Sequence, residues 1–339
     1  MTAEWRHVSA RFRTFLAELQ PAAGERYAAW AAARDVGALL RRRFLRPELD
    51  GDDGAGDVRV IGGFGNGTAV RPAASVDLLF VVPARFAVEA GVVASPGGGA
   101  DIAPLFRDMV ELLGARYAGV EMSPHGWLSV VADPRSSRAG AGSRMAVRVV
   151  PCFAGPGAGY RAAAGGARAG RGPWGRIHPQ AELDRLDRAD AASNGKARDL
   201  IRMLKAWRRA SGAALSTFAL ELLACEFVTL WIYQRQSALF YDWMVRDFFF
   251  WLTAQGGRTL RIPGTGETLA LGDVWCADAE IAYAAAAEAS DLERDNRDEQ
   301  ALAGWRRIFG LAFTGVPMPP PPPVVGARVI AWQARMASE

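Results

Sequence analysis

Apolar residues recur at helical spacing in two stretches near the N-terminus. One stripe includes Val8 and Leu19, and the other includes Val36 and Leu40. Because residues three or four positions apart share a helix face, this pattern predicts two amphipathic helices, and Pro21 predicts a break between them. Further along, four short runs rich in β-branched residues predict strands. These runs are residues 58–61, 76–82, 127–132 and 145–150.

The pattern changes in the second half of the chain, where apolar stripes at helical spacing predict a series of longer helices. These helices cover residues 195–209, 216–233, 238–252, 271–289 and 298–309. Residues 154–175, between the two patterns, are rich in Gly, Ala and Arg without clear periodicity, which predicts a mobile loop or a junction between lobes. A chain of 339 residues exceeds the size at which a single core usually divides. We therefore expect an α/β lobe packed against an α lobe.

Charge and cysteine content narrow the partners and the compartment. The formal net charge is only +4, but residues 135–209 hold 16 basic and 5 acidic side chains. This excess favours a polyanionic partner such as a nucleotide, although a solvated face of an arginine-rich chain would look the same. Three widely spaced cysteines without a CxxC pair indicate neither a disulfide framework nor a zinc site. We expect a cytoplasmic protein with no membrane partner, because there is no apolar signal core and the most apolar span carries Glu221 and Glu226.

The candidate chemistry begins at a glycine-rich turn that is followed by a strand. Gly62 and Gly63 lie between the first two predicted strands, and Ser75 and Asp77 follow on the second of them. Backbone N–H groups of such a turn can approach a phosphate closely. Residues i and i+2 of a strand project from the same face, so two carboxylates at such positions could jointly hold Mg²⁺. The turn alone is a weak signal, and a purely structural turn is the alternative.

The stretch from Gly62 to Val82 resembles the signature of the polymerase-β-like nucleotidyltransferases, specifically the relatives of cyclic GMP-AMP synthase that include the bacterial cyclic-oligonucleotide synthases (CD-NTases) of antiphage defence. The segments Val147 to Phe153, Leu200 to Trp207 and Leu215 to Glu221 resemble later family segments in the same order. This resemblance implies a mixed, twisted sheet with helices, a C-terminal helical domain and a nucleotide cleft between the two lobes. The implied regions are residues 1–160 for the core with its N-terminal helices, 161–316 for the helical domain and 317–339 for a Pro-rich spacer and final segment.

The same resemblance implies which residues bind the nucleotide triphosphate. The matching residues are Gly62, Gly63, Asn66, Thr68, Arg202, Lys205 and Ser216. Lys205, at the family's phosphate-contacting position, is one of only two lysines among 40 basic residues. The structural alternatives are a solvated basic stripe along its helix and, for Ser216, a helix cap. That stripe comprises Arg198, Arg202, Lys205 and Arg209.

Two of the three carboxylates that the family needs are missing. In the family, three acids hold two Mg²⁺ ions, one for the attacking hydroxyl and one for the triphosphate. The matching positions here are Ser75, Asp77 and Arg148, so Asp77 is the sole carboxylate left. A guanidinium is permanently cationic and offers no acceptor, which opposes a divalent ion beside it. We therefore expect a degenerate metal site, with Arg148 either pairing with Asp77 or gripping a phosphate that the metal would have held.

Three functions stay open on this sequence. The first is a degenerate, catalytically impaired nucleotidyltransferase-like protein that binds a nucleotide, a short oligonucleotide or an effector protein of a defence operon in a basic cleft. The second is an active enzyme that makes a cyclic or linear oligonucleotide second messenger with a non-standard metal site, in which Glu121 or Asp133 could replace a lost ligand. The third is a regulatory subunit that works through protein contact alone, with the polyproline run at 319–323 and the apolar segment 324–336 as its docking element.

Overall fold

A computed structural model describes most of the chain. It covers residues 6–46, 56–87, 103–117, 119–123, 127–132, 145–155, 157, 159–162, 175–237 and 240–314. The predicted polyproline run, the apolar segment after it and the whole predicted region 317–339 lie outside the described residues. Most of the loop predicted at 154–175 lies outside them as well.

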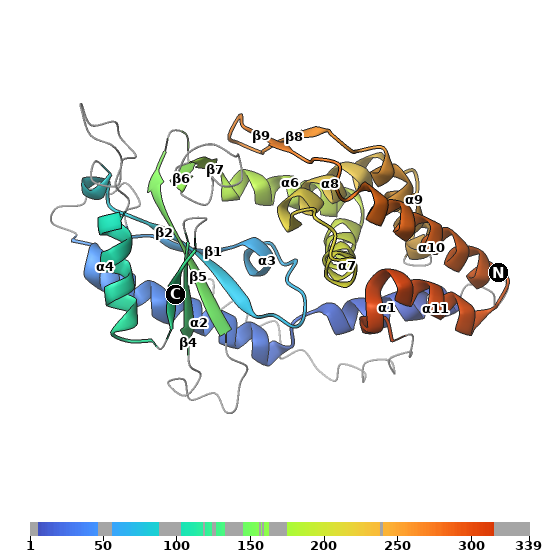
Figure 1. Cartoon of the computed structure of the whole chain (residues 1–339), viewed down its shortest axis with the longest axis horizontal. Helices are drawn as coiled ribbons and strands as arrows, with labels where there is room; N and C mark the ends of the chain where they lie inside the picture. The colour runs from blue at the N-terminus through green and yellow to red at the C-terminus, as the bar shows by residue number, and fades with distance from the viewer. Residues whose placement is uncertain are drawn as a thin grey trace.

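A mixed β-sheet forms one half of the molecule (Figure 1). Its strands follow the order β1-β2-β5-β4-β3, and β6 and β7 extend it from the end of β5. β2 and β5 pair in parallel, whereas β1–β2, β3–β4, β4–β5, β5–β6 and β6–β7 pair antiparallel. The strands are β1 (Val58–Ile61), β2 (Ser75–Val81), β3 (Val120–Met122), β4 (Leu128–Ala132), β5 (Met145–Ala154), β6 (Tyr160–Ala162) and β7 (Gly175–Ile177).

Helices cover the sheet and build the other half of the molecule. α2 and α4 pack on the sheet, whereas α1 packs on α7 and α9, so α1 and α2 together run along one side of both halves (Figure 1). A small hairpin of β8 (Thr259–Arg261) and β9 (Thr268–Ala270) projects from the helical half. The helices are α1 (Arg6–Leu19), α2 (Ala23–Phe44), α3 (Gly62–Gly65), α4 (Ala103–Gly114), α6 (Pro179–Ala192), α7 (Lys196–Ser211), α8 (Thr217–Leu230), α9 (Tyr241–Thr253), α10 (Cys276–Arg294) and α11 (Asp298–Phe309).

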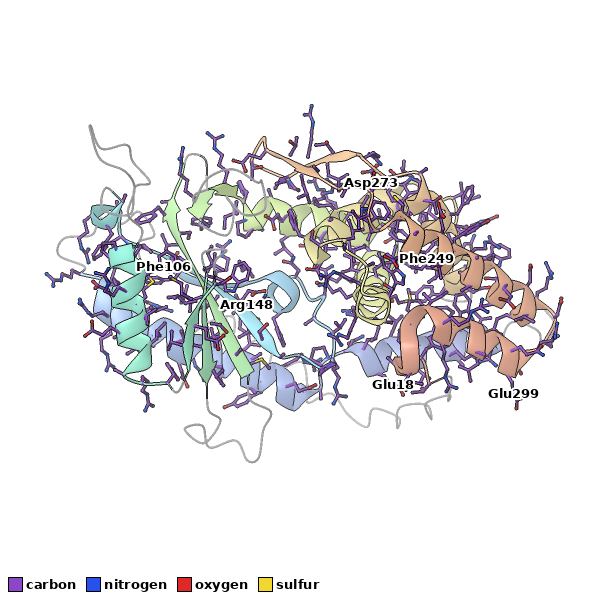
Figure 2. The ribbon with its side chains drawn as sticks, viewed as in Figure 1. Glu18, Phe106, Arg148, Phe249, Asp273 and Glu299 are labelled. Atoms are coloured by element: carbon purple, nitrogen blue, oxygen red, sulfur yellow. The ribbon has the colours of Figure 1, made fainter. Side chains whose placement is uncertain are left out.

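Three clusters of buried apolar side chains hold these elements together. One lies between α2, α4 and the sheet and includes Phe106, and a second fills the helical half and includes Phe12 and Phe249. Figure 2 shows Phe106 and Phe249 in different halves of the molecule. The third and smallest cluster, with Leu79 and Val150, involves β2 and β5. Burying one such aromatic or aliphatic side chain contributes roughly 1.5–3 kcal/mol, so each half has its own source of stability.

The structure confirms the expected fold class, a mixed sheet with helices followed by a helical region. The two N-terminal helices, the break at Pro21 and the strand at residues 58–61 are also confirmed. The pattern did not predict α6 or the strands β3, β6, β7, β8 and β9. α6 fully buries only Leu186 and Ala189, which is too thin a stripe to recognise, and a three-residue strand is too short to show alternation. The boundaries between the three expected regions stay predictions.

The most apolar span of the sequence, residues 213–233, which we expected to form a buried helix, contains α8. Leu220 and Leu223 on this helix are fully buried, and Glu221 beside them pairs with Lys205 of α7. An acidic residue is tolerated in such a position when a cation accompanies it. No helix within the described residues is long and apolar enough to cross a bilayer.

Candidate functional site

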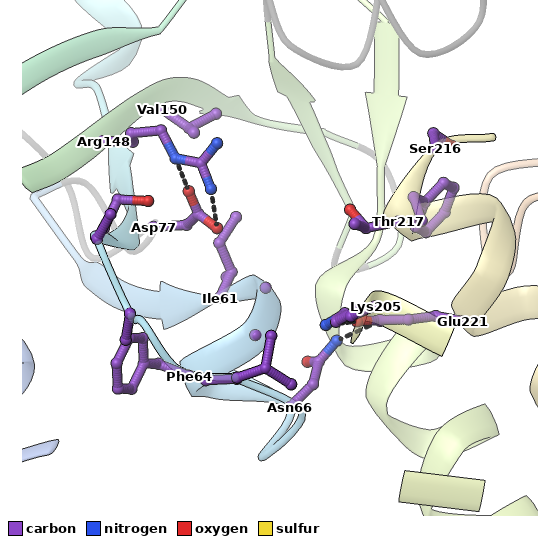
Figure 3. Close-up of a pocket in the computed structure, with 18 of the residues that line it drawn as sticks. Ile61, Phe64, Asn66, Asp77, Arg148, Val150, Lys205, Ser216, Thr217 and Glu221 are labelled. Atoms are coloured by element: carbon purple, nitrogen blue, oxygen red, sulfur yellow. Dashed lines mark hydrogen bonds and ion pairs between the residues drawn. The ribbon is translucent and has the colours of Figure 1, made fainter. Parts of the chain in front are cut away.

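A cleft of about 680 Å³ opens between the sheet and the helical half (Figure 3). β1, α3, β2 and β5 form one wall, and α7 and the start of α8 form the other. Most of the predicted site residues line it: Gly62, Gly63, Asn66, Ser75, Asp77, Arg148, Lys205 and Ser216. Two do not, because Thr68 is fully buried and Arg202 binds the backbone of Gly67 instead.

Asp77 and Arg148 face each other on the sheet wall of the cleft. They are direct partners in the register of the parallel strands β2 and β5, so their side chains project from the same face of the sheet. Nη2 of Arg148 donates a hydrogen bond to Oδ2 of Asp77 at 3.0 Å, and Nε lies 2.6 Å from Oδ1. The guanidinium also lies over the ring of Trp127, with 6.0 Å between Cζ and the ring centroid. We expected Arg148 either to pair with Asp77 or to bind a phosphate, and in this structure it pairs with Asp77.

Gly62 brings the glycine-rich turn into contact with this ion pair. Its φ is +63°, and a Cβ atom placed there would collide with Oδ2 of Asp77. Any other residue would therefore displace the carboxylate and also adopt a backbone conformation that L side chains rarely take. The turn itself is the single-turn helix α3, which packs on β1 and β2. Close packing against Asp77 is thus one physical reason for glycine at this position.

A second ion pair lies on the helical wall of the cleft. Nζ of Lys205 lies 2.7 Å from Oε1 of Glu221, and it donates to Oγ1 and to the carbonyl oxygen of Thr68 at 2.8 and 3.1 Å. Glu221 also accepts hydrogen bonds from Oγ1 of Thr68 at 2.9 Å and from Nδ2 of Asn66 at 3.2 Å. All three donors of the ammonium are therefore engaged. Burial alone would raise the pKa of Glu221, but Lys205 and these hydrogen bonds lower it below its usual value.

The basic stripe on α7 fastens the glycine-rich turn to the helical half. Residues at this spacing share one helix face, and each of the four side chains donates to a carbonyl oxygen of the segment between α3 and β2. The bonds run from Arg198 Nε to Asn66 O at 3.0 Å, from Arg202 Nη2 to Gly67 O at 2.7 Å, from Lys205 Nζ to Thr68 O at 3.1 Å and from Arg209 Nη1 to Arg71 O at 2.5 Å. The stripe is therefore not the solvated face that was one alternative. It satisfies backbone acceptors that the turn leaves without strand or helix partners.

Ser216 and Ser75 both line the cleft. Oγ of Ser216 accepts a hydrogen bond from the backbone N–H of Ala219 at 3.1 Å, which confirms Ser216 as the cap of α8. The side chain is exposed and lines the cleft, so a contact with a phosphate stays a prediction. Ser75 begins β2 and lies on the same strand face as Asp77, two residues further along.

Neither residue considered as a replacement ligand reaches Asp77 in the described part of the chain. Glu121 on β3 pairs with Ser129 on β4, and Ser129 pairs with Arg148 on β5. Glu121 therefore lies on the same row as Arg148 but two strands away, which is about 10 Å at the usual strand spacing. It does not line the cleft. Asp133 lies outside the described residues.

The charges that line the cleft are balanced, which corrects our expectation of a basic cleft. The charged lining residues within the described ranges are Arg148, Lys205 and Arg209 against Asp77, Glu182 and Glu221. The basic excess of the surrounding sequence is neutralised locally. Arg198, for example, pairs with Asp187 and Asp190 of α6 at 2.5 and 2.6 Å. A polyanion would thus meet few cations whose charge is not already paired.

The donor set around Asp77 does not fit a pair of Mg²⁺ ions. Mg²⁺ requires oxygen ligands in a near-octahedral arrangement, usually from one or two carboxylates together with phosphates and waters. Here the carboxylate of Asp77 already receives a guanidinium, and the two flanking positions offer a hydroxyl and that cation. A unit charge about 4 Å from another interacts by about 4 kcal/mol at an effective dielectric of 20, so the guanidinium would strongly oppose a divalent ion.

Glu221, like Glu182, is a charged cleft residue that the sequence did not identify as part of the site. It is one acidic residue within an apolar helical run, and Glu226 five residues later looks equivalent in the sequence. Glu226 instead pairs with Arg258, and both of those side chains are more exposed than Glu221. The only sequence signal for Glu221 was the general rule that a buried carboxylate needs a cation as its partner. That rule does not identify Lys205 as the partner, because their pairing depends on how α7 packs on α8.

The fold is shared with several solved structures, although no protein-family model and no curated protein matches the sequence. CdnC from E. coli MS115-1, solved with ATP, has a TM-score of 0.61 at 13% identity, over 90% of this chain and 98% of that chain. The same protein in a complex with HORMA-deltaN has a TM-score of 0.59 at 14% identity, over 89% and 96%. A variant of the Vibrio cholerae di-nucleotide cyclase DncV, in complex with ATP and GTP, has a TM-score of 0.58 at 13% identity, over 88% and 93%.

These similarities cover about nine tenths of the chain. The chain therefore has the fold of the CD-NTases, as the motifs of its sequence indicated. At identities of 13–14%, the similarity does not carry residue roles across.

Proposed function

We propose that this chain is a nucleotide-binding protein with a CD-NTase fold and impaired catalysis, acting in bacterial antiphage nucleotide signalling. The observation that carries the proposal is the Arg148–Asp77 ion pair, which occupies the sheet wall of the cleft with a guanidinium where the family needs a metal-binding carboxylate. A protein whose one remaining carboxylate at these positions is held by a guanidinium is poorly equipped to position an attacking hydroxyl through a metal, but it keeps the cleft itself.

The shape of the cleft and its location in the fold support a nucleotide as the ligand. Its volume of about 680 Å³ lies within the range typical of small-molecule sites. The glycine-rich turn forms part of its sheet wall, and Ser216 lies on the opposite wall. Two of the solved structures with this fold contain nucleotides, CdnC with ATP and DncV with ATP and GTP, which makes a nucleotide triphosphate or a short oligonucleotide the first ligand to test.

The proposal is tested on the full-length protein by measuring binding and product formation separately. Calorimetric titration with ATP and GTP should show binding, and incubation with labelled NTPs in Mg²⁺ or Mn²⁺ should yield no oligonucleotide. Thr217→Trp adds a large side chain to the cleft wall and should weaken binding by at least about tenfold, a loss of about 1.4 kcal/mol. Thr229→Trp, the same change at the exposed far end of α8, is the matched control and should leave the affinity unchanged.

Two results would count against the proposal in different ways. Robust oligonucleotide product that disappears in Asp77→Ala would show that the protein is an active enzyme with a non-standard metal site. A complete lack of nucleotide binding would remove the ligand assignment and favour an effector protein as the partner of the cleft.

A further inference from the structure

Arg148 is the cleft cation best placed to hold a phosphate. A guanidinium has five N–H donors: one on Nη2 donates to Asp77, and Nε lies 2.6 Å from Oδ1 of the same carboxylate without a hydrogen bond of good geometry. Nη1 donates to no residue that the structure describes, and Figure 3 shows this third nitrogen pointing away from Asp77. The Arg148 side chain is 40% exposed and lines the cleft. Trp127 supports the plane of the guanidinium from one side.

The other two cations of the cleft are less suited to this role. Lys205 is only 10% exposed, has all three donors engaged and is neutralised by Glu221 at 2.7 Å. Arg209 is exposed at the edge of α7 and donates to the carbonyl of Arg71, so its charge is more strongly screened by solvent and salt. Phosphate recognition by this cleft therefore depends on the sheet wall.

Taking the proposed function as given, we propose that the cleft binds nucleoside phosphates without a divalent metal, with the Nη1 side of Arg148 holding a phosphate. Planar guanidinium groups bind phosphate through two parallel N–H···O bonds, which replaces the charge neutralisation that Mg²⁺ supplies in other nucleotide sites. Asp77 then opposes the ligand, because its negative charge lies beside the phosphate and shares the same guanidinium. In this proposal Asp77, the one carboxylate left at the family's three metal-binding positions, weakens the binding of the ligand instead of holding a catalytic metal.

The test compares metal-free and metal-containing binding across a ligand series. Adenosine, AMP and ATP are titrated into the full-length protein by calorimetry, once in EDTA and once in excess Mg²⁺. We expect phosphate to increase the affinity in EDTA by at least about tenfold over adenosine, which is the effect of one charge-assisted hydrogen bond. Mg²⁺ should leave the affinity for ATP unchanged or weaken it, because the ion competes with Arg148 for the phosphate oxygens.

Two substitutions at the ion pair give the sharpest readout. Arg148→Gln should remove the affinity gained from phosphate while leaving adenosine binding in place. Asp77→Asn should tighten metal-free ATP binding, because the guanidinium loses its competing carboxylate. Arg294→Gln and Asp291→Asn make the same charge changes in an exposed pair on α10, away from the cleft, and should have no effect. If Arg148→Gln melts at a much lower temperature than the parent protein, Arg148→Lys provides a second variant. It keeps the positive charge but loses the planar guanidinium that can donate two parallel hydrogen bonds. It should therefore still lose most of the affinity gained from phosphate.

The outcomes separate this inference from the proposed function. Binding that requires Mg²⁺, or that is weakened by Asp77→Asn, would overturn metal-free recognition by Arg148 and leave nucleotide binding intact. A lack of binding to every ligand in both buffers would overturn the proposed function and this inference together. Retention of the phosphate gain in both Arg148 variants would overturn the assignment of that residue alone.

Discussion

The two walls of the cleft each carry one ion pair, but the pairs differ in how fully their groups are engaged. On the helical wall, Lys205 and Glu221 are 10% and 15% exposed, and hydrogen bonds from Asn66 and Thr68 complete the network. On the sheet wall, Arg148 is 40% exposed and keeps donors that no described residue accepts. The difference indicates that the helical wall is a structural junction and that the sheet wall is where a ligand can bind.

The helical wall joins the two halves of the molecule as well as lining the cleft. Its hydrogen bonds connect the turn after β1 with α7 and α8, so a change there should alter the position of the turn and the stability of the whole protein. Breaking the sheet-wall pair should change ligand binding and little else. The following predictions test this contrast, from the largest expected effect to the smallest.

Replacing Glu221 should have the largest effect on stability. Glu221→Leu leaves the ammonium of Lys205 buried without its counter-ion and removes the acceptor of Asn66 Nδ2 and Thr68 Oγ1. Removing one partner of a buried ion pair typically costs about 3–5 kcal/mol, which urea denaturation followed by circular dichroism would measure. Because the pKa of Glu221 is lowered in the folded protein, its contribution should be present above about pH 4.3 and be lost as the pH falls through the folded pKa.

Two variants show whether the effect of Glu221→Leu comes from the ion pair. Glu226→Gln removes a more exposed carboxylate from the same helix and should change the unfolding free energy by only about 0–1 kcal/mol. The double variant Glu221→Leu with Lys205→Met should be less destabilised than the sum of the two single variants, by about 0.5–3 kcal/mol. Strict additivity would mean that the two side chains do not depend on each other, and the helical wall would then not be a junction of the kind described.

Asp242 on α9 adds a comparison with the paired carboxylate of Glu221, because Asp242 is buried and has no cation paired with it among the described residues. It is fully buried and forms no ion pair with any residue that the structure describes, and burial raises its pKa to about 7, with Glu293 adding to the rise. A raised pKa in an acid means that the folded state holds a proton more tightly than the unfolded state. The contribution of Asp242 to the free energy of unfolding is therefore fully present below about pH 3.9, the pKa of an aspartate in the unfolded chain. As the pH rises from there to the folded pKa of about 7, this contribution is lost at about 1.4 kcal/mol per pH unit.

Replacing this carboxyl with an amide should therefore stabilise the protein at high pH. Asp242→Asn should raise the unfolding free energy by about 2–4 kcal/mol at pH 8 and by less at pH 5, since the amide carries no charge at either pH. Denaturation series at both values would measure the change, with the exposed Asp291→Asn as a control that should show no such pH dependence. Equal effects at pH 5 and pH 8 would contradict a titrating Asp242.

The sequence predicted the sheet wall better than the helical wall, and the reason is physical. Asp77 and Arg148 lie on strands whose patterns were clear, and each position of a strand has a fixed side, so their pairing could be expected before the structure was known. The Lys205–Glu221 pair depends on how α7 rotates and packs against α8, which an apolar stripe does not specify. The same reason explains why the basic stripe was expected at a phosphate or in solvent, although it binds carbonyl oxygens of the turn.

The smallest expected effect on stability comes from the sheet-wall pair, and it decides whether that wall is available to a ligand. Asp77 and Arg148 are 21% and 40% exposed, so either partner can be hydrated when the other is removed. Asp77→Asn and Arg148→Gln should therefore each change the unfolding free energy by no more than about 1 kcal/mol, the usual limit for pairs that water can reach. Urea denaturation at pH 7 would measure both. A loss of about 3 kcal/mol or more in either variant would mean that the pair is as structural as Lys205–Glu221, and a phosphate could then recruit Arg148 only by destabilising the fold.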